Sequence, residues 1–238
     1  MSDQLLSVAG LDAYYGDSHV LFDVGLEVRQ GQGVALLGRN GVGKSTLLKS
    51  LLDAGPRATG RIDFCGRPLA GLPTEKRARL GLMLVPEDRR IFPHLSVAQN
   101  LELAGHAAAR GTAPLSVAEI CERFPMIAPL TERQGYQLSG GQQQLVAVAR
   151  GIVPRPKLLL LDEPAEGLAP LIVQELAEEV RRIRAREGAA LLLAEQNVSF
   201  ARHCTDYVYL LDTGRVVFAG TWSEFDAQPE LKTRYLAV

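Results

Sequence analysis

The spacing of apolar residues predicts a chain in which strands and helices alternate. Val24, Leu26 and Val28 alternate with polar or small neighbours, which is typical of a strand with one buried face. Four shorter runs are apolar at nearly every position, a pattern typical of strands buried on both faces in a parallel sheet. Together these patterns predict strands at 5–10, 20–28, 33–37, 61–65, 81–86, 157–162 and 190–194, and a hairpin that joins 207–211 to 216–219.

Apolar residues at helical spacing predict helices between these strands. Ser96 and Ser116 can each cap a helix, and Pro170 suits the first turn of another helix that ends at Gly188. That last helix carries Glu early and Arg late, so its charges are most simply a solvated face. We expect one domain over 1–238, with a core formed by 1–88 and 155–238 and an inserted, mainly helical subdomain at 89–154.

Charge and cysteine content narrow the function classes. The 26 Lys and Arg against 27 Asp and Glu give a net charge of −1, so we expect no nucleic-acid partner. Cys65, Cys121 and Cys204 follow no disulfide or metal-binding spacing, which suits a reducing compartment. We expect no secretory signal and no spanning helix, because the N-terminus lacks a long apolar stretch and no apolar run approaches roughly 18 residues.

One glycine-rich stretch fits the P-loop pattern G-x-x-x-x-G-K-[ST]. A predicted buried strand precedes it and a predicted helix follows it, so backbone N–H groups and the helix dipole would converge on a phosphate. Lys44 can reach the β- and γ-phosphates, and the Ser45 hydroxyl can bind Mg²⁺. The predicted phosphate site comprises Gly38, Arg39, Asn40, Gly41, Val42, Gly43, Lys44, Ser45 and Thr46.

Two carboxylates follow the apolar strand 157–162, which we expect to lie beside the P-loop strand. Asp162, at the end of the strand, can bind Mg²⁺ directly or through water. Glu163 points in a different direction and can accept a proton from an attacking water, which is worth roughly 10²–10⁴-fold in rate. The alternative is that these residues and Pro164 merely end the strand.

A third motif, Leu138-Ser139-Gly140-Gly141-Gln142, offers another group of N–H donors at a helix start, although a plain N-cap also fits. In this order the three motifs resemble the ATP-binding-cassette (ABC) ATPase family over essentially the whole chain. The resemblance implies an α/β fold: a P-loop NTPase (RecA-like) core with a mainly parallel sheet, an N-terminal antiparallel β subdomain and an inserted α-helical subdomain.

The resemblance also implies how ATP is held. In this family two cassettes pack head to tail, and each ATP lies between the P-loop of one subunit and the signature motif of the other. Ser139, Gly140, Gly141 and Gln142 would then serve a partner's nucleotide. Tyr15 would stack on adenine, whereas local sequence alone leaves it as either a turn residue or a stacking surface.

Three positions depart from the family's commonest pattern and narrow the resemblance. Glu87 stands where the family often has glutamine, Gln196 where it often has histidine, and the loop 165–170 has alanine where it often has aspartate. Glu87 can bind Mg²⁺ but would repel a metal-free triphosphate, and Gln196 can donate a neutral hydrogen bond to a γ-phosphate. With the segment 86–95, these residues resemble the LivF-like ATPases of branched-chain amino acid importers, and ATPases of urea importers stay as an alternative.

The narrower resemblance implies partners. They are a second ATPase (LivG-like, or a second copy), two transmembrane permease subunits and, indirectly, a solute-binding protein, with this chain at the cytoplasmic face of the plasma membrane. Ile91, Phe92, Leu95 and Val97 either line a groove for a permease helix or pack inside the helical segment.

Three function classes follow from these motifs. The first is a transport ATPase that uses Lys44, Glu163, Glu87 and Gln196 in catalysis. The second is a soluble, non-transport ABC ATPase, which the single cassette and near-neutral charge disfavour. The third is a nucleotide-gated binding module, which the intact Glu163 disfavours.

Overall fold

The structure, a computed structural model, describes residues 3–236. The strands are β1 (Gln4–Tyr15), β2 (Ser18–Arg29), β3 (Gly33–Leu37), β4 (Arg57–Phe64), β5 (Arg67–Pro68), β6 (Leu82–Val85), β7 (Leu158–Asp162), β8 (Ala190–Glu195), β9 (Tyr207–Asp212) and β10 (Arg215–Thr221). The α-helices are α1 (Lys44–Leu52), α2 (Thr74–Arg79), α3 (Val97–Ala104), α4 (Val117–Arg123), α5 (Gly140–Ile152), α6 (Pro170–Glu187), α7 (Val198–Cys204), α8 (Trp222–Asp226) and α9 (Pro229–Tyr235).

The central sheet has six strands in the order β10-β9-β3-β8-β7-β6. All neighbours are parallel except the β9–β10 hairpin, so the predicted mainly parallel sheet is confirmed. The expectation that β7 lies directly beside the P-loop strand β3 is wrong, because β8 is inserted between them. Both β7 and β8 are apolar on both faces, so their sequences suit either position and do not decide their order.

Alternate residues of the central strands supply two separate hydrophobic cores. Leu158 and Leu160 face a core that also contains the inner residues of α1 and of the strands β1 and β2. Leu159 and Leu161 face the opposite core, which includes the apolar sides of α5 and α6. A strand side chain changes face at every residue, so one apolar run fills both cores.

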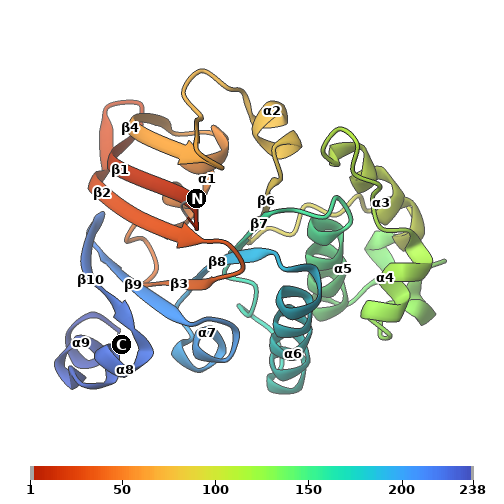
Figure 1. Ribbon diagram of the computed structural model, residues 1–238. Helices are drawn as coiled ribbons and strands as arrows, with labels where there is room; N and C mark the ends of the chain where they lie inside the picture. Colours follow the sequence, from red (N-terminus) through yellow and green to blue (C-terminus); the bar gives the residue numbers. More distant parts are fainter. Residues whose placement is uncertain (1–2, 237–238) are drawn as a thin grey trace.

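A second, antiparallel sheet has the order β2-β1-β4-β5, and it lies at the upper left of Figure 1. Its first two strands are longer than predicted, because β1 runs to Tyr15 and β2 starts at Ser18. The turn that joins these two strands therefore consists of Gly16 and Asp17 alone. Tyr14 pairs with His19 across the strands, and their rings stack at 4.2 Å between centroids, which extends the hairpin.

The predicted capped helices are present in the helical region at the right of Figure 1. Ser96, Ser116 and Ser139 each accept a hydrogen bond from the third residue of the following helix and form complete capping boxes. Helix α5 also packs on β6 and β7, so its apolar side belongs to the same core as the central sheet. The division of the chain into a core and a helical subdomain stays a prediction.

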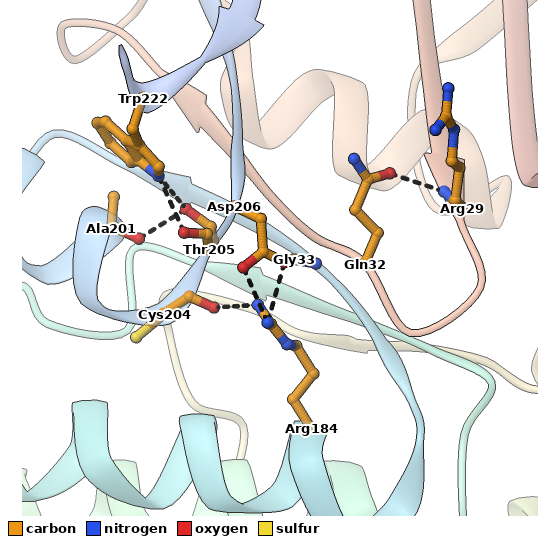
Figure 2. A network of polar contacts seen from close by, with 9 residues as sticks. All are labelled: Arg29, Gln32, Gly33, Arg184, Ala201, Cys204, Thr205, Asp206 and Trp222. Carbon is orange, nitrogen blue, oxygen red and sulfur yellow. Dashed lines mark hydrogen bonds and ion pairs between the residues drawn. The ribbon is translucent and has the colours of Figure 1, made fainter. Parts of the chain in front are cut away.

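The end of α6 is bound to the amino-terminal ends of β3 and β9 by polar contacts (Figure 2). Arg184 donates to the carbonyl of Cys204 at 2.8 Å and forms an ion pair with Asp206, whose carboxylate also accepts the Gly33 N–H at 3.1 Å. Gly188 then ends α6 in the left-handed conformation, as predicted, with φ 64°. Among residues 3–236, no helix combines the length and apolar character needed to span a bilayer.

Candidate active site

The predicted site residues gather where the central parallel strands end. Leu37 of β3 is in register with Glu195 of β8, and Ala194 of β8 is in register with Asp162 of β7. The carboxyl ends of these strands lie on one edge of the sheet, which is where parallel α/β folds bind ligands. The glycine-rich stretch after β3 and the residues that follow β7 and β8 are therefore brought together.

The glycine-rich stretch turns directly into α1. No side chain caps this helix, so its first N–H groups are left for an incoming anion. Gly43 occupies the N-cap position with φ 109°, and a Cβ there would lie 2.7 Å from Leu21 Cδ2. The chain needs glycine at this point for both its backbone angle and its close approach to β2.

Lys44 is buried and has three partners within its own chain. Its ammonium group donates to the carbonyl oxygens of Gly38 at 2.7 Å and Arg39 at 2.9 Å, and it pairs with Glu163 Oε1 at 2.9 Å. An ammonium group has three N–H donors, so these contacts use its whole capacity. A phosphate that binds Lys44 must take the place of at least one of them.

Ser45 and Asp162 form an oxygen-rich pair that suits a divalent cation. The Ser45 hydroxyl donates to Asp162 Oδ1 at 2.9 Å, and Asp162 is 1% exposed. The pKa of Asp162 is raised to about 6, chiefly by burial and also by the charges of Glu163 and Glu87, against the lowering effects of Ser45 and Lys49. A carboxylate that is costly to ionise in this position is stabilised when a cation binds it, so the donor set fits Mg²⁺.

The structure offers few other ligands for such a cation. Across the part of the chain that it describes, no three His, Cys, Asp or Glu side chains are arranged to hold a metal ion. Mg²⁺ commonly uses one or two protein oxygens together with substrate phosphates and water, so the Ser45–Asp162 pair fits the protein share of such a site.

Glu163 adopts an uncommon backbone conformation beside this pair. Its φ is 46°, and its N–H donates to the carbonyl of Ala194 at 2.9 Å. Its carboxylate meets Lys44 and also interacts with Glu166, whose pKa is raised chiefly by hydrogen bonding to Glu163. A left-handed non-glycine residue at a site edge is typical of a functional position.

The remaining predicted residues lie at the same edge or on other faces. Glu87 is exposed in the loop after β6, near enough for its charge to act on Asp162 and Glu166. Gln196 is half-buried directly after β8. Tyr15 is 43% exposed at the end of β1, where its ring can be reached from solvent.

The signature residues cap α5, so the plain N-cap interpretation is correct as far as Ser139 and Gln142 are concerned. Gln142 N–H and Ser139 Oγ are 3.4 Å apart, and the Ser139 N–H donates to Gln142 Oε1 at 3.0 Å. Gly140 lies against Arg89 and Gly141 against Ile172. Ser139 and Gly140 remain exposed, which leaves this helix start accessible to a second subunit.

Sequence patterns missed Glu195 as a site residue. It is 3% exposed, and its carboxylate accepts N–H groups from Ala165, Gln196 and Asn197, each at 3.1 Å. Burial raises its pKa to about 7, although these hydrogen bonds act in the opposite direction. The signal available in the sequence is a single acidic residue at the end of the otherwise apolar run 190–195.

Comparison with known proteins identifies the family of this site. A family model described as ABC transporter matches residues 21–166. The chain belongs to the ABC transporter family. It is 38% identical over 232 residues to the high-affinity branched-chain amino acid transport ATP-binding protein BraG of Pseudomonas aeruginosa, covering 98% of this chain and 99% of that one.

Other members of the family are similar to this chain over comparable lengths of sequence. A probable branched-chain amino acid transport ATP-binding protein LivF of Archaeoglobus fulgidus is 33% identical, covering 92% of this chain and 93% of the relative. A solved ATP binding subunit of an ABC transporter superposes with a TM-score of 0.79 at 32% identity, covering 98% of this chain and 96% of that one. The chain is thus an ABC transporter ATP-binding subunit with the P-loop fold of the family's ATPases.

Proposed function

We propose that this chain is the ATP-hydrolysing subunit of an importer for branched-chain or other neutral amino acids. The observation that carries the hydrolytic part is the meeting of Lys44, Asp162 and Glu163 at one edge of the parallel sheet. The observation that carries the solute class is the similarity to BraG over nearly the full length of both chains.

The residues of the site suggest how hydrolysis proceeds. The phosphates of ATP bind at the uncapped start of α1 and draw Lys44 away from Glu163. Ser45 and Asp162 would hold Mg²⁺, which would supply positive charge that offsets the charge of the phosphates. Glu163, released from its ion pair, accepts a proton from the attacking water as the water oxygen bonds to the γ-phosphorus, while ADP leaves. Gln196 donates a hydrogen bond to a γ-phosphate oxygen.

A second cassette completes the site in this proposal. The exposed Ser139 and Gly140 at the start of α5 would face the nucleotide of a LivG-like partner or of a second copy. Tyr15 would stack on the adenine held by its own P-loop, which is consistent with its 43% exposure. Glu87 would face the metal from the loop after β6.

A hollow lined by residues of α2, β6 and α3 is the candidate contact with the membrane subunits. Its volume is about 540 Å³, and its walls include the half-exposed Leu103 together with Arg79, Arg89 and Arg90. None of the four residues expected from sequence for this groove lines the hollow. Val97 is fully buried and Ile91 packs against the core, whereas Phe92 is 44% exposed and Leu95 is half-buried. Packing inside the helical segment, the alternative interpretation, therefore describes Val97 and Ile91. A permease segment with apolar and acidic side chains would suit the hollow.

The test is the ATPase activity of the full chain purified with the membrane subunits that accompany it. We expect Mg²⁺-dependent hydrolysis that Glu163→Gln abolishes, and stimulation when the assembled transporter receives leucine with its binding protein. Stimulation by urea and not by leucine would support the urea importer alternative. If the wild-type assembly hydrolyses ATP no faster than Glu163→Gln, the enzymatic proposal is wrong.

A further inference from the structure

Glu195 connects the two loops that carry the proposed base and the proposed γ-phosphate contact. Its Oε1 accepts the Ala165 N–H at 3.1 Å, and Ala165 belongs to the loop after β7 that begins at Glu163. Its Oε2 accepts the N–H groups of Gln196 and Asn197, both at 3.1 Å, in the loop after β8. One side chain thus holds two loops that are separated by about thirty residues of sequence.

The position of the Glu163 loop depends on this contact. The loop meets β8 at two points, where the Glu163 N–H donates to the carbonyl of Ala194 and the Ala165 N–H donates to Glu195. The left-handed conformation of Glu163, with φ 46°, is uncommon for a non-glycine residue and persists when surrounding contacts fix it. The Ala165 contact lies two residues from Glu163 and provides such a constraint.

Burial of the Glu195 carboxylate has an unfavourable free energy, although the carboxylate holds two loops together. Glu195 is 3% exposed, and the removal of a carboxylate from water is unfavourable unless hydrogen bonds compensate for it. Its pKa, raised to about 7, shows that compensation is incomplete. A glutamine of similar shape would avoid the charge but has a single acceptor oxygen, so it can satisfy one loop and not both.

We propose that Glu195 is a positioning residue for ATP hydrolysis, whose carboxylate sets the distance between the Glu163 and Gln196 loops so that both act on one γ-phosphate. The proposal rests on the function proposed above. Glu195 itself touches neither nucleotide nor metal in this arrangement. Its loss should therefore lower turnover while ATP still binds at the P-loop.

The test compares Glu195→Gln and Glu195→Ala with the wild-type chain, each purified with its membrane partners. We expect kcat to fall about tenfold in Glu195→Gln, the change that accompanies loss of about one charge-assisted hydrogen bond, and further in Glu195→Ala. The Kd for a fluorescent, non-hydrolysable ATP analogue should stay within about threefold. Thermal unfolding of each sample reports the folded fraction.

A matched control and a double mutant separate positioning from general damage. Glu119 also accepts a backbone N–H through its carboxylate, from Ser116 at 2.8 Å, but it caps α4 away from the site. We expect Glu119→Gln to keep kcat within about twofold. Combining Glu195→Gln with Gln196→Ala should cost less than the product of the two single effects, because both act through one loop.

The outcomes of this experiment are distinct. The positioning role is wrong if folded Glu195→Gln hydrolyses ATP at the wild-type rate. It is also wrong if the affinity of this variant for the ATP analogue falls by as large a factor as its kcat. In both cases the activity of the wild type is unaffected by the result. If the wild-type assembly itself does not hydrolyse ATP, the proposed function fails and the positioning role fails with it.

Discussion

The pH dependence of folding stability in Glu195→Gln tests the electrostatics of the site without ATP or metal. Burial raises the pKa of Glu195 from 4.5 to about 7. Two ionisable groups interact with Glu195. The charge of Glu163 raises the pKa of Glu195, and the charge of Glu195 raises the pKa of the Cys204 thiol on α7. Burial raises the pKa of that thiol to about 12, so it stays neutral near pH 7.

The sign of the effect follows from proton linkage. Because the folded protein holds the proton of Glu195 more tightly than the unfolded chain, wild-type stability decreases as pH rises from about 4.5 to about 7. One pKa unit corresponds to about 1.4 kcal/mol, so this shift is worth at most about 3 kcal/mol, and we expect about 1–3 kcal/mol. Glutamine has no such proton, so the variant lacks this decrease.

Urea unfolding of wild type and Glu195→Gln between about pH 5 and about pH 8 measures the difference. Loss of N–H acceptors shifts the stability of the variant equally at every pH. The informative quantity is therefore how the difference in unfolding free energy between variant and wild type changes with pH. We expect the variant to gain about 1–3 kcal/mol relative to wild type across this range. Glu119→Gln should show no such gain, because hydrogen bonds from Ser116 lower the pKa of Glu119. A flat difference for Glu195→Gln would refute the reasoning.

Three further predictions concern the site and its supports. Gln196→Ala should lower ATP turnover less than Glu163→Gln, because it removes one neutral hydrogen bond and not the base; the reverse order of kcat values would contradict these roles. Arg184→Met should lower the free energy of unfolding, measured in urea, by about 1–3 kcal/mol, because Arg184 loses its contacts with Cys204 and Asp206 (Figure 2). Gly43→Ala should weaken binding of a fluorescent ATP analogue at least tenfold, since φ 109° is unfavourable for alanine and its Cβ would lie 2.7 Å from Leu21 Cδ2; unchanged affinity would contradict the need for glycine at this N-cap.

Local sequence was sufficient for the elements that carry their own signals. Ser96, Ser116 and Ser139 sit three residues before a side chain that completes a capping box, so each helix start is encoded within four residues. The signal for the apolar strands likewise lies within each short apolar run. The helices α2, α7, α8 and α9 went unpredicted, because each spans two turns or fewer and shows little periodicity.

The pattern of apolar and polar residues did not predict how segments far apart in the sequence are arranged in space. The insertion of β8 between β3 and β7 depends on which buried strand pairs with which, and apolar runs of similar composition do not specify that. The importance of Glu195 likewise emerges only after folding, because one of its three donors comes from Ala165 on another strand's loop. Val97 and Ile91 show the same limit, since periodicity does not separate a groove residue from a core residue.

The charges at the site favour an active form that is assembled and holds metal. Glu163 faces Lys44, while Asp162, Glu87 and Glu166 add further carboxylates at the same edge of the sheet. A nucleoside triphosphate adds more negative charge, and like charges in a partly buried site repel strongly. The backbone N–H groups of α1 offset part of this charge. In the proposed function, a divalent cation and the helix start of a second cassette would supply the remaining positive potential, so we expect ATP affinity to depend steeply on both.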